Sequence, residues 1–346
     1  MTHQRKQAGQ VPERRSFLNG FPLRSPTTGK ACELTSQSDL SRLQKYRLPI
    51  MHQFSDLAKF LEITEQRLMW LTLDKGKHYK RFELKKKSGK IRVIHAPRPA
   101  IKSAQHAILR QILDKVPLTE QAMGFAKGRS IKQHAQLHQG RAIVVSLDLE
   151  NFFPTIRSKR VFGLFRQLGY SEEVALALSL ICTRKGSLPQ GAPTSPAIAN
   201  LICRKLDTRL NGLAKKFVAN YSRYADDLTF SGDLPFKAAL HHFLPMLRKI
   251  VSNERFRLNK DKIRFARASA SQIVTGLVVN QNVNLPRKER KRLRAVLHQA
   301  EAHGLPTVRN VATSHVKEAL QGKLAFAQFI NPQSAKSLYN QFRRLR

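Results

Sequence analysis

Three aspartates lie in segments that otherwise have the pattern of buried strands. Asp148 follows the apolar run 143–147, and Asp226 and Asp227 lie within the aromatic segment Tyr221–Phe230. Burying a lone carboxylate in such a segment costs several kcal/mol unless a cation compensates its charge. An Asp-Asp turn facing a third aspartate from a neighbouring strand would form an oxygen-rich pocket suited to Mg²⁺. Two such ions, about 3.5–4 Å apart, could catalyse an in-line phosphoryl displacement.

Each of these aspartates also has an ordinary structural interpretation. Two adjacent aspartates in a turn are commonly a solvated pair of charges that only shapes the turn. Asp148 could equally cap a helix or form one half of a salt bridge. The other motifs of the chain therefore have to decide between catalysis and structure.

Periodicity predicts the elements that must position these carboxylates. Residues 141–149 (RAIVVSLDL) form a short β-branched apolar run and predict a buried strand. Residues 77–97 alternate apolar and basic side chains around a central Ser-Gly, which predicts a two-stranded hairpin rich in lysine and arginine. Residues 287–304 predict an amphipathic helix. Strand and helix patterns therefore mix, and we expect an α+β fold.

The net charge restricts the class of partner. The chain has 346 residues, with 62 Lys+Arg against 23 Asp+Glu and a formal net charge of +39. Such an excess opposes a compact state by self-repulsion and points to a polyanion, most simply nucleic acid, as the natural partner. With 41% hydrophobic residues the chain can bury a core, which excludes disorder throughout.

Cysteine usage and hydropathy indicate the compartment. Cys32, Cys182 and Cys203 form no CxxC pair and leave one thiol over in any disulfide scheme, which favours a reducing environment. The first residues lack the apolar core of a signal peptide. The longest apolar stretch, near 174–182, is half the ~18 residues that a membrane-spanning helix needs. We therefore expect a cytoplasmic protein that does not act at a membrane.

Five ordered motifs resemble those of reverse transcriptases. Ser146–Ile156 (SLDLENFFPTI) resembles the first motif of the catalytic palm, and Leu188–Pro196 (LPQGAPTSP) the motif that grips template and primer. Residues 224–227 (YADD) resemble the metal-binding hairpin. Phe82–Leu113 resembles the fingers region, and Arg257–Lys262 the segment after the palm helix.

Two further elements narrow the resemblance to the bacterial retron class. Retron enzymes resemble one another in an Asn-Ala-x-x-His element before the palm and a Val-Thr-Gly element after it. Residues 274–276 match the second element completely, and residues 134–138 (HAQLH) match the first, with His134 in place of asparagine. The resemblance implies an RNA-directed DNA polymerase with fingers, palm and helical thumb.

The resemblance also implies which residues hold the metal. Asp148, Asp226 and Asp227 match the family's catalytic carboxylates, and the backbone carbonyl of Leu149 matches a further ligand. Two Mg²⁺ ions are the implied cofactor. A primer hydroxyl would attack the α-phosphate of a deoxynucleoside triphosphate, and pyrophosphate would leave.

Two residues match contacts to the incoming nucleotide from opposite sides. Arg92 matches a fingers arginine that grips the triphosphate, a task suited to its planar fork, with Lys85–Lys87 close by on the hairpin. Phe153 matches a bulky residue that lies under the sugar and clashes with a 2′-hydroxyl. Core packing is the alternative for Phe153, and is the interpretation we prefer for its neighbour Phe152.

Three further residues match positions near the nucleotide. Gln190 and Gly191 resemble a turn whose small residue lets the backbone approach nucleotide and template closely. Lys262 matches a lysine that protonates the leaving pyrophosphate, with a salt bridge as its structural alternative.

The candidate RNA-binding residues form two groups. By resemblance, the retron elements recognise the enzyme's own structured RNA, although a structural histidine and a simple bend are the alternatives. Their candidates are His138, Val274, Thr275 and Gly276. The helix at 287–304 falls in the thumb region and would contact duplex phosphates with strong salt dependence. Its candidates are Arg287, Lys288, Arg290, Lys291 and Arg294.

The resemblance divides the chain into a basic arm (1–48), fingers (49–140), palm (141–280) and a basic helical thumb (281–346). It implies that a cognate non-coding RNA is copied into multicopy single-stranded DNA, with an RNA 2′-hydroxyl as the primer.

Retron systems of this kind resemble antiphage defences that include a separate effector protein. Another bacterial reverse transcriptase, of the group II intron or diversity-generating type, and a non-catalytic RNA-binding scaffold remain the alternatives.

Overall fold

The computed structural model describes residues 37–73, 77–85, 89, 91–303 and 316–344. Most of the predicted arm at 1–48, together with Lys86 and Lys87 of the predicted hairpin, lies outside these residues. The elements in chain order are α2 (Leu40–Lys45), α3 (Phe54–Phe60), α4 (Glu65–Leu73), β1 (Tyr79–Lys85), β2 (Ile91–Pro97), α5 (Pro99–Gln111), η1 (Leu113–Lys115), α6 (Ile131–Gln136), β3 (Ile143–Asp148), α7 (Phe152–Thr155), α8 (Ser158–Leu168), α9 (Glu172–Cys182), α10 (Thr194–Ile202), α11 (Arg204–Lys216), β4 (Ala219–Tyr224), β5 (Asp227–Gly232), α12 (Leu234–Ala238), α13 (Leu240–Asn253), η2 (Lys260–Lys262), β6 (Arg264–Arg267), β7 (Ile273–Val274), β8 (Leu277–Val278), α14 (Arg287–His303), α15 (Val316–Ile330) and α16 (Pro332–Arg344). None of these described helices is long and apolar enough to cross a membrane.

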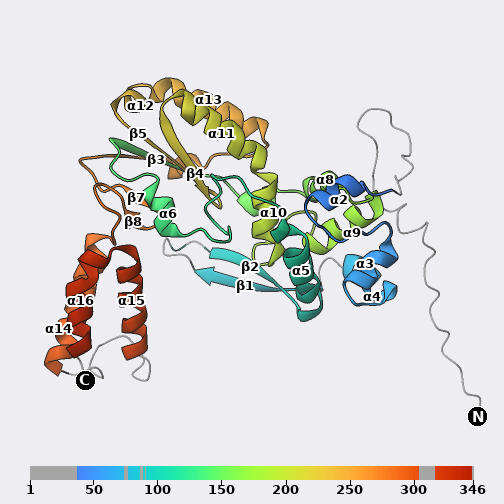
Figure 1. Ribbon diagram of the computed structural model, residues 1–346, viewed down its shortest axis with the longest axis horizontal. Coiled ribbons are helices and arrows are strands. Elements are labelled where there is room, and N and C mark those ends of the chain that lie inside the picture. Colours follow the sequence, from blue (N-terminus) through green and yellow to red (C-terminus); the bar gives the residue numbers. More distant parts are fainter. Residues whose placement is uncertain (1–36, 74–76, 86–88, 90, 304–315, 345–346) are drawn as a thin grey trace, which may run out of the picture.

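A four-stranded antiparallel sheet, in the order β4-β5-β3-β6, carries the predicted strand at 141–149 as β3. All of β3 except Ser146 is buried, as its β-branched run predicts. Helices α11, α12 and α13 cover one face of the sheet (Figure 1). Phe230 of β5, Phe236 of α12 and Phe243 of α13 pack there edge to face, with centroid distances of 5.0 and 5.1 Å. This apolar layer fixes the sheet whose strand ends carry the aspartates.

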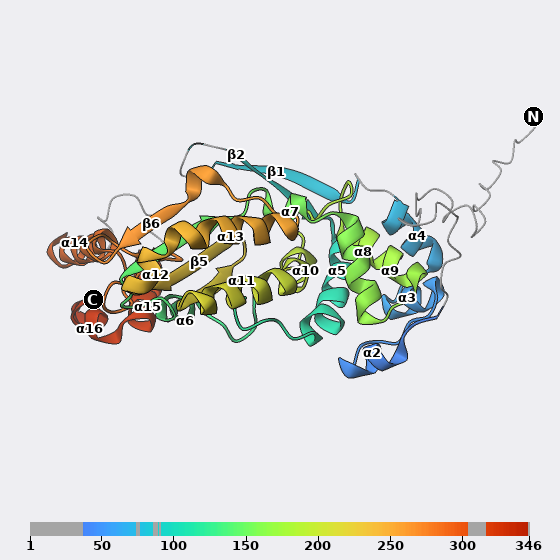
Figure 2. The same cartoon turned by 90° about the horizontal axis from the view of Figure 1, so that it is seen from above.

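The basic hairpin predicted at residues 77–97 is confirmed as β1 and β2. Its register runs from Tyr79 opposite Pro97 to Lys85 opposite Ile91. The buried Tyr79 anchors its base, since its hydroxyl accepts a hydrogen bond from Gln105 of α5 (2.8 Å). The remainder of the hairpin projects along one side of the molecule, with α2 on the other side (Figure 2).

One tight contact joins the β1–β2 hairpin to the loop between α9 and α10. The carbonyl of Gln190 accepts a hydrogen bond from the amide of His95 (2.8 Å). Gly191 has a φ of +120°, and a Cβ there would lie 2.8 Å from Ile94 Cγ2 and 2.9 Å from the carbonyl oxygen of His95. Glycine is therefore required at this position by both backbone conformation and space.

Replacing Gly191 by alanine is expected to lower the free energy of unfolding by about 2–3 kcal/mol, through backbone strain and displacement of β2. Urea unfolding measures the loss. Gly128→Ala is the matched control, because Gly128 also has a positive φ (+75°) but has open space at the Cβ position. Its loss should be only about 1 kcal/mol. Equal losses in the two variants would contradict the contact with β2.

A separate apolar cluster holds the C-terminal helices α14, α15 and α16, which lie together at one end of the molecule (Figure 1). The predicted helix at 287–304 is confirmed as α14. Leu293 and Leu297 are buried in this cluster and Val296 packs against it, as the periodicity predicts. The mixed α+β class of the chain is therefore confirmed.

Candidate active site

The three aspartates meet at one end of the central sheet. Asp148 is the last residue of β3 and Asp227 the first of β5, and the antiparallel register pairs them directly. Asp226 lies beside them in the turn between β4 and β5. Asp148 thus comes from a strand that neighbours the Asp-Asp turn, which is the condition under which the sequence analysis expects an oxygen-rich pocket.

Ala225 gives the turn between β4 and β5 its tight form. Its φ of +56° lies in the left-handed region, which costs roughly 1–2 kcal/mol for a residue with a Cβ. Backbone bonds hold the surroundings: the amide of Leu149 donates to the carbonyl of Asp226 (2.9 Å). The amide of Asn259 donates to the carbonyl of Asp148 (2.8 Å). The segments that carry the carboxylates are thus tied to one another.

The carboxylates repel one another and are partly withdrawn from water. Burial raises the pKa of Asp226, and the charge of Asp148 adds to the effect. The pKa of Asp227 is raised to about 6, first by desolvation and then by the charges of Asp226 and Asp148. Lys262 opposes both shifts. The sheet end therefore holds more negative charge than its neighbours compensate.

Lys262 forms the salt bridge that we considered as its structural alternative. Its Nζ lies 2.7 Å from Oδ2 of Asp148, with the lysine side chain 50% exposed and the aspartate 11% exposed. A partner that is half in water can be replaced at modest cost. The role of Lys262 toward pyrophosphate stays a prediction.

The donor chemistry of the site fits a divalent cation. Within the described ranges, no three His, Cys, Asp or Glu side chains are already arranged around one point. However, three carboxylates share one sheet end, two of them have raised pKa values, and an ammonium group contacts the third. Hard oxygen donors with uncompensated charge are the ligands that Mg²⁺ prefers.

Arg92 of β2 acts electrostatically on one of these carboxylates and shares a face of the hairpin with a residue that contacts the Gly191 loop. Alternate residues of a strand share a face, so Arg92 shares one with Ile94, whose Cγ2 lies against Gly191. The charge of Arg92 also lowers the pKa of Asp226, against the larger effect of burial. The structure thus brings Arg92 close to the carboxylates. Lys85, at the end of β1, is exposed.

The two phenylalanines after Asp148 differ in burial. Phe152 is only 4% exposed and stacks on Phe256 with 5.8 Å between centroids, so its predicted place in the core is confirmed. Phe153 is half-buried and its ring contacts Phe152 edge to face at 5.3 Å. Part of the Phe153 ring therefore remains available to a ligand.

A cavity of about 380 Å³ joins Asp148 and Asp227 to the two sequence elements at 134–138 and 274–276. Its lining includes Asp148, Asp227, Lys262, His134, Val274, Thr275 and Gly276. The two elements also touch, since Nδ1 of His134 lies 3.3 Å from Oγ1 of Thr275. Histidine in place of asparagine thus keeps a polar contact with Thr275.

The structure contradicts direct RNA contact by the side chains of two candidates. His138 is 0% exposed, and its Nδ1 and Nε2 each lie 2.7 Å from a serine hydroxyl, of Ser231 and Ser222. Val274 is 2% exposed and belongs to the apolar cluster of the C-terminal helices. The structural interpretation of His138 was therefore the right one. Thr275 is half-buried and Gly276 exposed, so both remain accessible.

The burial of His138 predicts acid sensitivity. Burial lowers its pKa to about 3, so between pH 6.5 and 3 the unfolded chain binds a proton that the folded chain does not. The stability that His138 contributes at pH 7 is therefore lost as the pH falls. In urea unfolding, His138→Gln should lose about 2 kcal/mol less than the unaltered protein between pH 7 and pH 5. The remaining loss includes that of His134, whose pKa burial lowers to about 4. An unchanged pH dependence in the variant would contradict a neutral buried imidazole.

The basic residues of α14 mostly face solvent. Lys288 and Lys291 are exposed, as are Arg287 and Arg294. Arg290 differs, since it is half-buried and its buried Nε has no hydrogen-bond partner among the described residues. Four of the five candidates are therefore free to reach a polyanion.

Sequence reasoning missed a buried ion pair next to the turn between β4 and β5. Arg223 of β4 and Asp207 of α11 are both fully buried, with 2.7 Å between Nη2 and Oδ2. The available signals were a charged residue beside the apolar stripe of α11 and an arginine two residues after Tyr221 on the same face of β4. Neither signal identifies the partner, because the contact joins different elements.

The part of the chain that carries the site and the sheet matches a known family. Residues 84–302 match the family model described as Reverse transcriptase (RNA-dependent DNA polymerase). The chain belongs to this family of RNA-directed DNA polymerases.

Curated relatives refine this membership. The chain is 37% identical to the retron Mx65 reverse transcriptase of Myxococcus xanthus, over 87% of this chain and 73% of that protein. It is 36% identical to the retron Ec86 reverse transcriptase of Escherichia coli, over 74% and 81% of the two chains. Among solved structures, it is similar to telomerase from Candida albicans with a fragment of telomeric RNA, at a TM-score of 0.45 and 12% identity, covering 76% of this chain and 56% of that one. Within its family the chain belongs to the retron reverse transcriptases, as the sequence elements predicted.

Proposed function

We propose that this retron reverse transcriptase copies a cognate structured non-coding RNA into multicopy single-stranded DNA, using Mg²⁺ and deoxynucleoside triphosphates. The observation that carries the proposal is the convergence of Asp148, Asp226 and Asp227 at one sheet end. Lys262 contacts this cluster, and Arg92 acts on it from the hairpin. Cations and carboxylates in this arrangement suit the transfer of a nucleotidyl group.

Two Mg²⁺ ions would be held by the carboxylates of Asp148, Asp226 and Asp227 and by the carbonyl of Leu149. When bound, the ions lower the pKa of the attacking hydroxyl and neutralise charge on the transferred phosphoryl group. The raised pKa values of Asp226 and Asp227 support this assignment, because a cation would relieve the repulsion between them.

Lys262 and Arg92 act on the triphosphate. The half-exposed ammonium of Lys262 can leave Asp148 and donate a proton to the departing pyrophosphate. Arg92 holds phosphate oxygens through two parallel N–H bonds, which fixes the α-phosphate for attack. Phe153 lies under the sugar and excludes ribonucleotides. Gln190 and Gly191 connect the hairpin to the template strand.

The proposed regions are fingers at 49–140, palm at 141–280 and thumb at 281–346, in a right-hand polymerase architecture. The exposed basic residues of α14 would contact phosphates of the primer–template duplex. Thr275 and Gly276, in the loop between β7 and β8, would contact the structured RNA. Their place in the cavity of Asp148 and Asp227 supports a contact near the primer end.

Membership in the retron reverse transcriptases supports priming from a guanosine 2′-hydroxyl within the template RNA, which would yield a branched RNA–DNA hybrid. The hybrid would act with a separate effector protein in antiphage defence.

The activity is tested by incorporation of deoxynucleotides on a primed RNA template with Mg²⁺, and the cognate RNA by sequencing copurified nucleic acid. We expect template-directed DNA synthesis and a copurified RNA joined to DNA through a 2′-oxygen. Tight RNA binding without DNA synthesis would instead favour a non-catalytic scaffold.

A further inference from the structure

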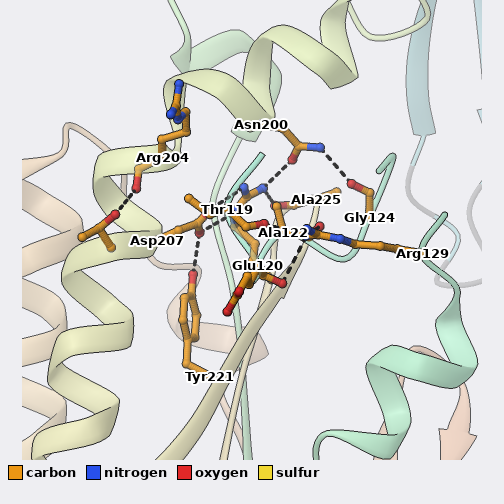
Figure 3. A network of polar contacts seen from close by, with 12 residues as sticks. Thr119, Glu120, Ala122, Gly124, Arg129, Asn200, Arg204, Asp207, Tyr221 and Ala225 are labelled. Atoms are coloured by element: carbon orange, nitrogen blue, oxygen red, sulfur yellow. Dashed lines mark hydrogen bonds and ion pairs between the residues drawn. The ribbon is translucent and has the colours of Figure 1, made fainter. Parts of the chain in front are cut away.

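The buried ion pair of Arg223 and Asp207 lies next to the turn between β4 and β5, the catalytic turn of the proposed function. Figure 3 shows Asp207 and Tyr221 in the polar network around Ala225 of this turn. The guanidinium and carboxylate of the pair are joined by two parallel bonds, Nε to Oδ1 at 2.8 Å and Nη2 to Oδ2 at 2.7 Å. Both side chains are 0% exposed. Apolar residues of similar volume are often at least as stabilising as a buried ion pair, because both charges must be taken out of water. Stability alone therefore does not explain why this pair is present.

Asp207 is held by two further donors. The hydroxyl of Tyr221 donates to its Oδ1 (2.9 Å) and the hydroxyl of Thr119 donates to its Oδ2 (2.9 Å). Each carboxylate oxygen thus accepts two hydrogen bonds, from three residues on two segments of the chain, strand β4 and the loop that contains Thr119. The charge of Asp207 is fully compensated, and its position is fixed.

Arg223 extends this network to the catalytic turn. Its Nη1 donates to the carbonyl of Ala225 (3.2 Å) and to Oδ1 of Asn200 (2.9 Å). Ala225 is the left-handed residue that directly precedes Asp226. A charged donor on the carbonyl of Ala225 holds the peptide that joins it to Asp226. The guanidinium therefore reaches from a fixed carboxylate to the backbone of a proposed metal ligand.

A loop supports the same turn from another side. The amide of Arg223 donates to the carbonyl of Gln121, and the amide of Met123 donates to the carbonyl of Arg223, both at 2.7 Å. At Gly124, whose carbonyl accepts a bond from Asn200, a Cβ would lie 2.9 Å from the amide nitrogen of Ala225. The network and the loop thus enclose Ala225 and leave it little room to move.

We propose that Arg223 and Asp207 are positioning residues for the reaction: the pair fixes the carbonyl of Ala225 and, through it, the carboxylate of Asp226. The inference rests on the proposed function. Small displacements of catalytic groups have large effects on rate, which gives a buried and costly pair a reason to be present. Neither residue touches substrate, since both are fully buried.

Arg223→Lys tests this role, because lysine keeps the charge but cannot hold both Asp207 and the carbonyl of Ala225. We expect kcat on a primed RNA template to fall at least about tenfold. The KM for deoxynucleotides and the affinity for primer–template should change less than about twofold, because the binding surfaces are intact. The Mg²⁺ concentration for half-maximal activity should rise.

Glu254→Gln is the matched control. Glu254 directly follows α13, is buried, and pairs with Arg209 (2.8 Å) of α11, the helix that carries Asp207. Among the described residues this pair makes no bond to the catalytic turn. Its kcat and Mg²⁺ dependence should equal those of the unaltered protein, even where thermal unfolding shows a similar loss of stability. Failure of the proposed function would appear as inactivity of both the unaltered protein and this control.

Gly124→Ala provides a second variant that leaves the ion pair in place and displaces Ala225 directly. Gly124→Ala should reproduce the loss of kcat and the altered Mg²⁺ dependence. It therefore tests the inference even if Arg223→Lys does not fold. Folded Arg223→Lys or Gly124→Ala protein with the kcat and Mg²⁺ dependence of the unaltered protein would overturn the inference.

Discussion

Replacing Asp226 by alanine is expected to reduce deoxynucleotide incorporation by about 10³-fold, equivalent to roughly 4 kcal/mol of transition-state stabilisation. The reason is that the variant loses one of three carboxylates that share the sheet end with Lys262 and would hold the metal ions. Affinity for RNA should be retained, since the basic residues of α14 are unchanged. Single-turnover incorporation on a primed RNA template measures the first effect, and filter binding the second.

Asp233→Ala serves as the control for this experiment. Asp233 directly follows β5, at the end opposite Asp227, and pairs with Arg141 (2.8 Å) in a partly exposed position. The control removes the same functional group and changes the net charge by the same amount, so it should keep the full rate. If Asp226→Ala polymerised at the rate of the unaltered protein, the metal assignment would be wrong.

The elements around the active site could be predicted because their signals are local. The short, β-branched apolar run at 143–147 favours a buried strand, and the alternation around Ser-Gly at 77–97 favours a two-stranded hairpin. Once Asp148 ends one strand and the Asp-Asp turn begins another, antiparallel pairing places the carboxylates together. Local patterns therefore predict the strand and the turn that carry the carboxylates, while the pairing of β3 with β5 that brings them together comes from the structure.

Contacts between distant segments could not be predicted in this way. His138 carries a motif signal, but its burial depends on two serines that lie 84 and 93 residues further along the chain. Likewise, the glycine at 191 is visible in the sequence, while the strand β2 that excludes a side chain there is not. Sequence motifs identify residues such as His138 and Gly191, but they do not identify the distant residues that these contact.

Charge placement explains why the few acidic residues are informative. In a chain with a net charge of +39, the repulsion among Asp148, Asp226 and Asp227 is partly offset by Lys262 and, at Asp226, by Arg92. Lys262 and Arg92 also suit a triphosphate. A bound triphosphate would therefore share these two cations with the carboxylates that they already offset. A site of this kind needs added cations when nucleotide binds, which agrees with the proposed Mg²⁺ ions.

Phe153→Ala is expected to raise the use of ribonucleotides relative to deoxynucleotides by about 100-fold, equivalent to roughly 2.7 kcal/mol of lost discrimination. The proposed clash requires the Phe153 ring under the sugar, and its half-buried position leaves part of the ring free to meet the 2′-hydroxyl. The measurement is the ratio of kcat/KM for a ribonucleotide and its deoxynucleotide on one primed RNA template.

The neighbouring phenylalanine separates sugar selection from packing. Phe152 is 4% exposed and stacks on Phe256, so Phe152→Ala should destabilise the protein by about 3–5 kcal/mol through the cavity it leaves. Because this ring lies in the core, the sugar ratio of the folded Phe152 variant should stay unchanged. For Phe153→Ala we expect the reverse, a small loss of stability and a large change in the ratio of ribonucleotide to deoxynucleotide use. If Phe153→Ala destabilised the protein and left the ratio unchanged, its ring would belong to the core and selection of the sugar would lie elsewhere.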